Sequence, residues 1–486
     1  MRRALTLTSS VAGAAIVALD GTALTVAQPT LRHDLHASVA QVQWTGTGYL
    51  VAVAALLVFA GRLGDRYGHR RVFGIGMLGF GAASAGIVAA PDVRWVIGLR
   101  VVQGVFGALL QPATLGMLRA AFPPDRLRMP IAVRTAAIGV AAAAGPLVGG
   151  ALATEFGWRS VFLLNLGPTL VFGTLALAQR EERLPAAGVK ESRQSAAARP
   201  LDIPGALLLG TSLACLVHAL VTLPHLTWSA PAALLAGAAF VRHERRAPAP
   251  SLPPDVIGSP AVGAALLLLV TVSAALNGGL FACVYVLQDG LGLTPLHSAL
   301  LALPLPVLLI GAAPVSAVLL RRAGARVTVA GATVLLSAGL LVLAAAPGPV
   351  LFCAGFALAG AGFGTVMVAA THVVVRQAPV ASAGVAGGLQ QTAMNVGPAL
   401  GVAAATVLMT TGADRSPLVL LAVAALAALP VCRALPGRSP HVGAGARAAP
   451  RVAPQAAPQT AKSDTPHTGH GRETGPYTRS LGNDGH

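Results

Sequence analysis

Three charged side chains lie inside apolar stretches of the sequence. Asp20 lies deep in the stretch at about residues 6–27, Arg100 about one turn into that at 95–118, and Arg134 near the start of that at 131–152. A charged group at the centre of a membrane helix costs at least about 2.5–3.5 kcal/mol, so it normally faces a wet cavity or a partner. Asp20 is too deep for its short side chain to escape, so we predict a functional role for it, with a structural pair to a buried donor as the alternative. The longer side chain of Arg134 is expected to reach the membrane surface.

The composition indicates that these stretches cross a membrane. Of the 486 residues, 55% are hydrophobic and 10% are charged, and the mean hydropathy is +0.71, which leaves too little polar surface for a soluble protein of this length. About 20 apolar residues span a bilayer, and most of the stretches reach that length, although the eighth is short. We predict an all-α, polytopic membrane protein with about 14 transmembrane helices. They lie at about residues 6–27, 43–60, 72–90, 95–118, 131–152, 160–178, 202–222, 227–241, 261–286, 298–319, 327–346, 350–373, 384–410 and 416–432.

The distribution of basic residues predicts the orientation. Most of the 34 Lys and Arg residues fall on one side of the membrane when the N-terminus is placed inside. Cytoplasmic loops carry such an excess, so we predict that both termini are cytoplasmic. The net charge of +17 then favours contact with anionic membrane lipid, whereas a nucleic-acid partner would need a continuous basic face that the sequence lacks. Lysine is rare and alanine and glycine dominate, which is typical of a GC-rich bacterial genome and hence of a bacterial plasma membrane.

A short cationic loop, GRLGDRYGHRRV at 61–72, joins the second and third stretches. Its glycines permit a tight turn and close helix approach, and its acid is placed to pair with an arginine or to cap a helix N-terminus. The loop resembles the signature G-x-L-x-D-R-x-G-R-R of the major facilitator superfamily of transporters, with His69 where Arg or Lys is usual. The resemblance implies a cytoplasmic gating role for Gly61, Asp65, Arg66, Gly68, Arg70 and Arg71.

Further segments resemble motifs of the drug:proton antiporter family with fourteen spans. They are LDGTALTVAQP at 19–29, QVQWTGTGYL at 41–50 and RVVQGVFGALLQP at 100–112, while the second half of the chain matches more loosely. Gln28 and Thr25 depart from the first motif, where Leu and Asn are usual. The resemblance implies that Asp20 and Arg100 act in proton coupling, because an arginine beside an acid favours its charged form and loss of that partner reverses the effect.

The segment GPLVGG resembles the core of a motif associated with antiporters, although an ordinary packing face of small residues would look the same. Small residues let helix backbones approach closely, and a proline allows a bend. The residues of this motif are Gly145, Pro146, Gly149 and Gly150.

The resemblance implies two pseudo-symmetric six-helix bundles with two extra central helices, and a substrate site near the midplane between the bundles. The expected regions are a bundle at 1–178, a cytoplasmic linker at 179–201, two extra helices and a loop at 202–260, a second bundle at 261–434, and a disordered tail at 435–486. The candidates for lining the substrate cavity are Trp44, Tyr49, Gln103, Asn277 and Gln390, with His218, Gln391 and Asn395 as further polar groups.

No phosphate-binding loop, catalytic constellation or metal motif is found, so we expect neither an enzyme nor a cofactor. We predict a monomer that uses protons to export a lipophilic drug or antibiotic by alternating access. The alternatives are a proton-coupled uptake symporter, against which GPLVGG is the main feature, and a non-transporting membrane sensor or scaffold. No acid lies deep in any stretch after Asp202, which argues against a dicationic substrate.

Overall fold

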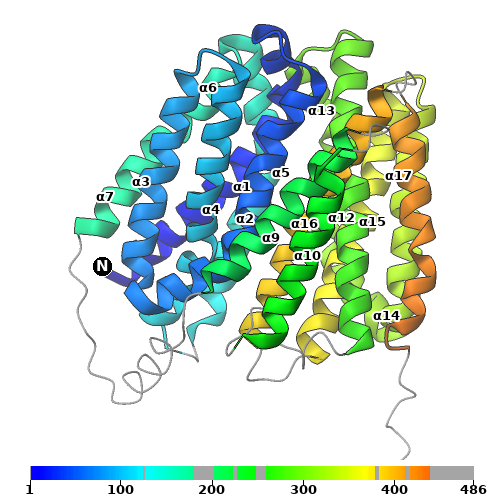
Figure 1. Cartoon of the computed structure of the whole chain (residues 1–486). Coiled ribbons are helices and arrows are strands. Elements are labelled where there is room, and N and C mark those ends of the chain that lie inside the picture. Colours follow the sequence, from blue (N-terminus) through cyan, green and yellow to red (C-terminus); the bar gives the residue numbers. More distant parts are fainter. Residues whose placement is uncertain are drawn as a thin grey trace, which may run out of the picture. The chain divides into compact units, whose positions relative to one another are not determined.

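The computed structural model describes residues 2–123, 126–178, 202–222, 227–247, 259–377, 383–410 and 415–437. These ranges contain helices and no strand, so the all-α prediction is confirmed for them (Figure 1).

The first half comprises α1 (Arg2–Asp34), α2 (Val39–Tyr67), α3 (His69–Val88), α4 (Val93–Ala121), α5 (Arg128–Phe156), α6 (Arg159–Leu163) and α7 (Leu166–Ala178). Two central helices follow, α9 (Ile203–Val221) and α10 (Ser229–Arg246). The second half comprises α12 (Pro260–Tyr285), η2 (Val286–Gly290), α13 (Pro295–Ala302), α14 (Pro304–Ala345), α15 (Pro349–Gln377), α16 (Ala383–Thr410), α17 (Ser416–Ala427) and η4 (Leu429–Ala434).

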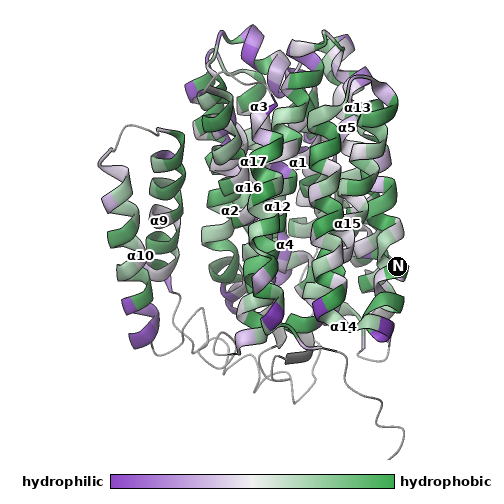
Figure 2. Ribbon diagram, turned by 90° about the vertical axis from the view of Figure 1, so that its right-hand side faces the viewer, coloured by the Kyte–Doolittle hydropathy of each residue, from purple (hydrophilic) through white to green (hydrophobic). Residues whose placement is uncertain are grey.

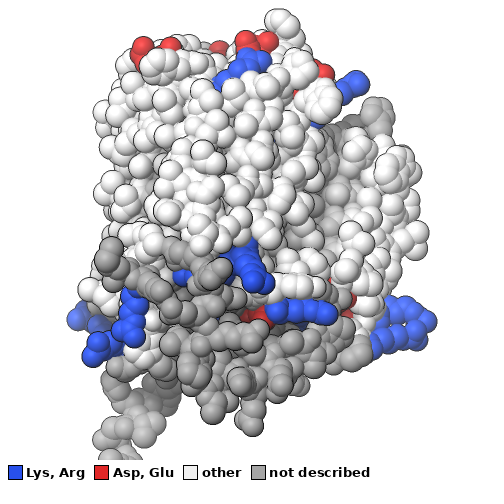
Figure 3. All heavy atoms as spheres, turned by 90° about the vertical axis from the view of Figure 1, so that its left-hand side faces the viewer, with Lys and Arg blue, Asp and Glu red and all other residues white. Residues whose placement is uncertain are grey.

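Twelve helical segments within the described ranges are long and apolar enough to cross a membrane. Figure 2 shows apolar residues along most of the length of the helices. On the face in Figure 3, basic side chains gather mainly along the lower rim and acidic ones mainly along the upper rim, with an uncharged belt between them. These features identify a multi-pass membrane protein.

The twelve segments differ from the fourteen predicted stretches at two places. Pro295–Ala345 counts as one segment of 51 residues, but its helix α14 is broken at Gly324, where φ is 79° and ψ is 169°. Glycine adopts this conformation readily because it has no β-carbon. The other difference is α10, whose last turns carry several charged residues and which is not among the twelve.

The helices pack mainly within their own half of the chain. In the first half α1 packs on α5, and α2 and α3 pack on α4; in the second half α14 packs on α15, and α12 packs on α16. The halves meet chiefly where α2 contacts α16 and where α5 contacts α13. The helix α9 contacts both α2 and α16, and α10 packs on α9, so this pair lies against the seam between the halves (Figure 2).

Capping residues determine where two helices of the candidate site begin. Ser38 forms a capping box with Gln41 at the start of α2, which carries Tyr49. The Asp92 carboxylate accepts hydrogen bonds from two backbone N–H groups at the start of α4, which carries Arg100. These caps satisfy backbone groups that the first turn of a helix otherwise leaves unpaired.

The predicted linker at 179–201 lies outside the described residues, as do residues 248–258 of the loop after α10 and residues 438–486 of the predicted tail.

Candidate functional site

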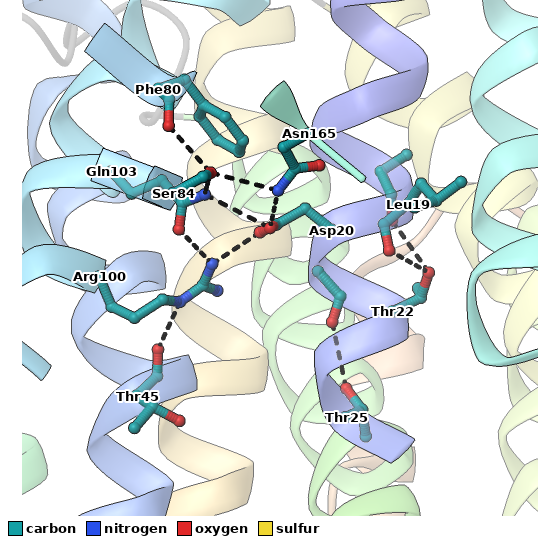
Figure 4. Close-up of polar contacts among 12 residues, drawn as sticks. Leu19, Asp20, Thr22, Thr25, Thr45, Phe80, Ser84, Arg100, Gln103 and Asn165 are labelled. Carbon is teal, nitrogen blue, oxygen red and sulfur yellow. Dashed lines mark hydrogen bonds and ion pairs between the residues drawn. The ribbon is translucent and has the colours of Figure 1, made fainter. Parts of the chain in front are cut away.

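Asp20 of α1 and Arg100 of α4 form a buried ion pair (Figure 4). Arg100 Nη1 lies 2.6 Å from Asp20 Oδ2, and the two side chains are 1% and 0% exposed. Arg100 Nε also donates to the carbonyl oxygen of Thr45 in α2 at 2.8 Å. A lone charge would be very costly at this depth, so each group permits the other to remain buried.

Amide and hydroxyl side chains complete the hydrogen bonding of the pair. Asn165 Nδ2 donates to Asp20 Oδ1 at 2.8 Å, and Gln103 Nε2 lies 3.4 Å from the same oxygen. Gln103 Oε1 accepts from Arg100 Nη1 at 2.6 Å. Ser84 Oγ accepts from both amides and donates to a backbone carbonyl one turn earlier in α3. Ser84 and Asn165 are not among the predicted site residues.

Aromatic rings enclose the guanidinium group. Arg100 Cζ lies 4.5 Å from the centre of the Tyr49 ring and 5.8 Å from that of Phe162. A cation that is removed from water gains about 2 kcal/mol or more from such a ring. These contacts and the hydrogen bonds hold Arg100 in one position.

A cavity of about 540 Å³ lies between the two halves, with lining residues from α1, α2, α4 and α5 on one side and from α12 to α16 on the other. Arg100 lines this cavity, whereas Asp20 does not. Figure 4 shows Thr22 and Thr25, two lining residues, on the other side of α1 from Asp20. Arg100 therefore contacts the buried acid and also borders the cavity.

Some of the other residues that the sequence predicts to line the cavity do so in the structure, and others do not. Tyr49 and Asn277 line the cavity, as do Gln391 and Asn395. Gln103 belongs instead to the hydrogen-bond network of the ion pair.

Three further candidates lie elsewhere. Trp44 packs against the small apolar cluster where α2, α9 and α16 meet. Gln390 Nε2 donates to Thr371 Oγ1 of α15 at 2.6 Å. His218 Nδ1 lies 3.0 Å from the Ser229 hydroxyl of α10, so it joins the two central helices.

Arg134 also lines the cavity, which corrects the expectation that it reaches the membrane surface. Its Nε donates to Thr114 Oγ1 at 3.0 Å, and its Nη2 lies 3.4 Å from the carbonyl oxygen of Gln111. Among the described residues, no acid forms an ion pair with Arg134 and none lines the cavity. The two charged lining residues are therefore both arginines.

The GPLVGG motif of α5 contacts both halves of the protein. Gly145 and Gly149 face α1, and a β-carbon on Gly149 would lie only 2.7 Å from the backbone of Ala23. Gly150 faces the second half, where a β-carbon would lie 2.9 Å from the carbonyl oxygen of Pro295 in α13. Real β-carbons do not approach other atoms so closely, so these contacts require glycine.

The loop after α2 is more helical than the sequence predicts. The helix continues through Gly61 and Gly64, and the chain turns at Gly68, where φ is 94°. The partner of Asp65 among the described residues is His69, with 3.2 Å between Oδ1 and Nε2, rather than an arginine.

The His69 ring, which departs from the family signature, fills a space between helices. A β-carbon on Gly64 of α2 or on Gly116 of α4 would collide with this ring. His69 is therefore part of the packing at this end of the first half.

Ion pairs connect the two halves at the opposite end. Arg32 Nη1 lies 2.7 Å from Asp289 Oδ2, and His33 Nε2 lies 3.0 Å from Asp289 Oδ1. Nearby, Gln288 Nε2 donates to the carbonyl oxygen of Val26 at 2.9 Å. We call the three residues Arg32, His33 and Asp289 the outer latch.

The arrangement places a carboxylate, a group that can bind a proton, in contact with an arginine of a mainly apolar cavity. Within the described ranges, no group of three His, Cys, Asp or Glu side chains is placed to hold a metal ion. Asp20 is the carboxylate that forms an ion pair with a lining residue among those described here.

Comparison with known proteins agrees with this architecture. The family model for the Major Facilitator Superfamily matches residues 11–402 and, in a second match, 266–464. The chain belongs to the major facilitator superfamily. The superfamily and the names of the relatives indicate a transporter rather than an enzyme.

Among the relatives of this superfamily member, the tetracenomycin C resistance and export protein of Streptomyces glaucescens is 39% identical over 420 residues, which cover 84% of this chain and 76% of that protein. The multidrug efflux pump LfrA of Mycolicibacterium smegmatis is 32% identical over 416 residues, covering 81% and 78%. The inward-open structure of the xylose transporter XylE from E. coli shares the fold, with a TM-score of 0.62 at 13% identity and coverage of 89% and 96%.

We expect Asn165→Ala to lower the free energy of unfolding by about 1–3 kcal/mol, because the buried carboxylate loses a donor. The melting temperature of the purified protein should fall accordingly. Thr174→Ala is the control, since that hydroxyl is exposed and bonds only to carbonyls of its own helix. Equal melting temperatures for the two variants would contradict the assigned role of Asn165.

We expect Gly149→Ala to separate α5 from α1 and to cost about 1–3 kcal/mol through overpacking. Thermal stability and transport rate should both decrease. Gly98→Ala is the matched control, because a β-carbon there meets nothing within 4 Å. If both variants behave like wild type, close approach at Gly149 is not required.

Proposed function

We propose that this protein exports lipophilic drugs or antibiotics across a bacterial plasma membrane in exchange for protons. The observation that carries the proposal is the buried Asp20–Arg100 pair, whose arginine lines a large central cavity. The relatives named for antibiotic export and multidrug efflux support the same kind of substrate. A cavity of this volume is in the range of typical small-molecule sites.

Proton binding to Asp20 would change the charge balance beside the cavity. With the acid ionised, the charge of Arg100 is compensated at 2.6 Å. Protonation removes that compensation, and leaving one partner of a buried pair alone costs about 3–5 kcal/mol. The protonated protein therefore favours an arrangement in which Arg100 contacts water or a ligand. A shift between two arrangements of the halves then follows from their different affinity for the proton.

Alternating access requires that the halves separate at one end at a time. Four hydrogen bonds join the two halves at the end that holds the outer latch: Arg32 and His33 to Asp289, Gln288 to Val26, and Leu296 to Thr154. We assign this end to the outside, because the loop at 61–72 and most basic residues lie at the other end, which is cytoplasmic by the positive-inside tendency. In this assignment both termini are cytoplasmic, and the loop with Asp65 and its arginines controls the inner side.

The proposed topology has fourteen crossings. The helix break at Gly324 divides the segment Pro295–Ala345 into two crossings, which raises the twelve segments to thirteen. The helix α10, which packs on α9, is the fourteenth crossing. The helices α9 and α10 are then the two extra central helices between six-helix bundles. We propose that the protein acts as a monomer.

The test is substrate-induced proton movement in inverted membrane vesicles with a preformed proton gradient. Tetracenomycin C, named for one relative, is the first probe. We expect wild type to release protons when a probe is added, and Asp20→Asn to lose this response by a factor of about ten or more while still inserting. Glu155→Gln, an exposed acid, is the control. A full response in Asp20→Asn would move the coupling site elsewhere, and a substrate flux in the opposite direction would favour uptake.

The outer latch gives a further prediction. Asp289→Asn removes both ion pairs, and each pair near the surface contributes about 0.2–1 kcal/mol, so the outer side should open up to about thirtyfold more often. Opening is measured by labelling Gln28→Cys, a lining position, with a membrane-impermeant maleimide in a background without the four natural cysteines. Asp92→Asn, which removes a negative charge at the same end but keeps a capping side chain, is the control. Unchanged labelling in Asp289→Asn would show that the latch does not hold the outer side closed.

A further inference from the structure

The charges that line the central cavity are unbalanced. Of the two lining arginines, Arg100 is compensated by Asp20, which lies behind it. Arg134, in α5 of the same half, has hydrogen bonds to Thr114 and Gln111 but no acidic partner among the described residues. With Asp20 ionised, the cavity therefore carries a surplus positive charge at Arg134.

The guanidinium group of Arg134 is both oriented and incompletely bonded. Its Nε is held by Thr114 Oγ1 at 3.0 Å, which fixes the plane of the group against α4. Its Nη1 makes no hydrogen bond to any described residue. Gln111, which also lines the cavity, offers a side-chain amide that is likewise without a described partner. Such donors are suited to an anionic oxygen, because charge-assisted hydrogen bonds to arginine are strong and directional.

The remainder of the lining is suited to an apolar body. Large apolar side chains of the second half contribute to it, and several polar lining groups are already bonded within their own helices. The apolar lining residues of the second half include Leu276, Leu280, Phe281, Leu309, Phe356 and Phe363.

We propose that the cavity selects lipophilic organic anions, in which a carboxylate, phenolate or enolate pairs with Arg134 while the apolar body lies against the second half. This inference rests on the proposed function and specifies its substrate class. A lipophilic cation would meet surplus positive charge at Arg134 and would find no acid among the lining residues that the structure describes. The selectivity thus comes from repulsion of cations as well as from attraction of anions.

The experiment compares three probes that share one apolar body. Pyrenebutyrate is the anion, pyrenebutanol the neutral analogue and pyrenebutyltrimethylammonium the cation. Equilibrium binding is measured by dialysis against the purified full-length protein in nanodiscs of zwitterionic lipid, with empty nanodiscs subtracted. We expect wild type to bind the anion about tenfold or more tightly than the alcohol, with the cation weakest.

Variants then assign the preference to Arg134. Arg134→Gln should weaken pyrenebutyrate binding about tenfold and leave pyrenebutanol unchanged, while Arg134→Lys should keep the order of the three probes. Arg119→Gln is the matched control, since Arg119 is exposed and does not line the cavity. Similar affinities for the three probes in wild type, or an equal loss for all three in Arg134→Gln, would overturn the proposal.

Binding in nanodiscs needs no proton gradient, so this result is separate from the vesicle test. An anion preference together with a proton response that survives in Asp20→Asn would support the selectivity and reject the coupling site. Similar affinities for the three probes together with a proton response that is lost in Asp20→Asn would support proton exchange and reject the selectivity.

Discussion

The cost of a charge in an apolar interior is the constraint on which the first half of this protein depends. Asp20 and Arg100 are fully buried, and they remain so because four separate segments contribute to their bonding: α1, α2, α4 and the turn before α7. None of these helices can shift far without breaking a bond to a charged group. The pair is therefore a structural centre of the first half.

Close contact between helix backbones connects α1, which carries Asp20, to the second half through α5. The helix that carries Asp20 packs on α5 at Gly149, and the same short motif contacts α13 of the second half at Gly150. A change in the position of α1 is thus coupled through α5 to the other half without an intervening flexible side chain.

The sequence predicted the features that depend on hydrophobicity and on costly charges. The helical membrane fold, the burial of Asp20 and Arg100 and the presence of α9 and α10 as helices all follow from long apolar stretches and from the few charges within them. Ser84 and Asn165 were missed because such side chains are frequent in membrane helices, where many bond only to their own backbone, as Thr174 does. Only the rotation of each helix about its axis decides which of them faces the pair.

The rotation and the exact ends of the helices, which the sequence does not determine, also explain why the predictions for the cavity and for the loop at 61–72 differ from the structure. Gln103 and Trp44 have the residue types of a binding site, but their helix faces point to the ion pair and to α9. Arg134 lies near a helix end, where a long side chain can reach the surface, and only the tertiary structure shows that it turns inward to Thr114. In the loop, Gly61 and Gly64 allow a turn, but they also allow helix α2 to continue, and packing around His69 favours the helix.

The uncompensated Arg134 has an electrical consequence. If one proton enters as one monovalent anion leaves, each cycle moves two elementary charges in the direction favoured by a membrane potential that is negative inside. That potential contributes about 2.3 kcal/mol per charge for every 100 mV. An exporter with this cavity would therefore continue to concentrate its substrate outside when the pH difference across the membrane has disappeared, and would stop only when the voltage also collapses.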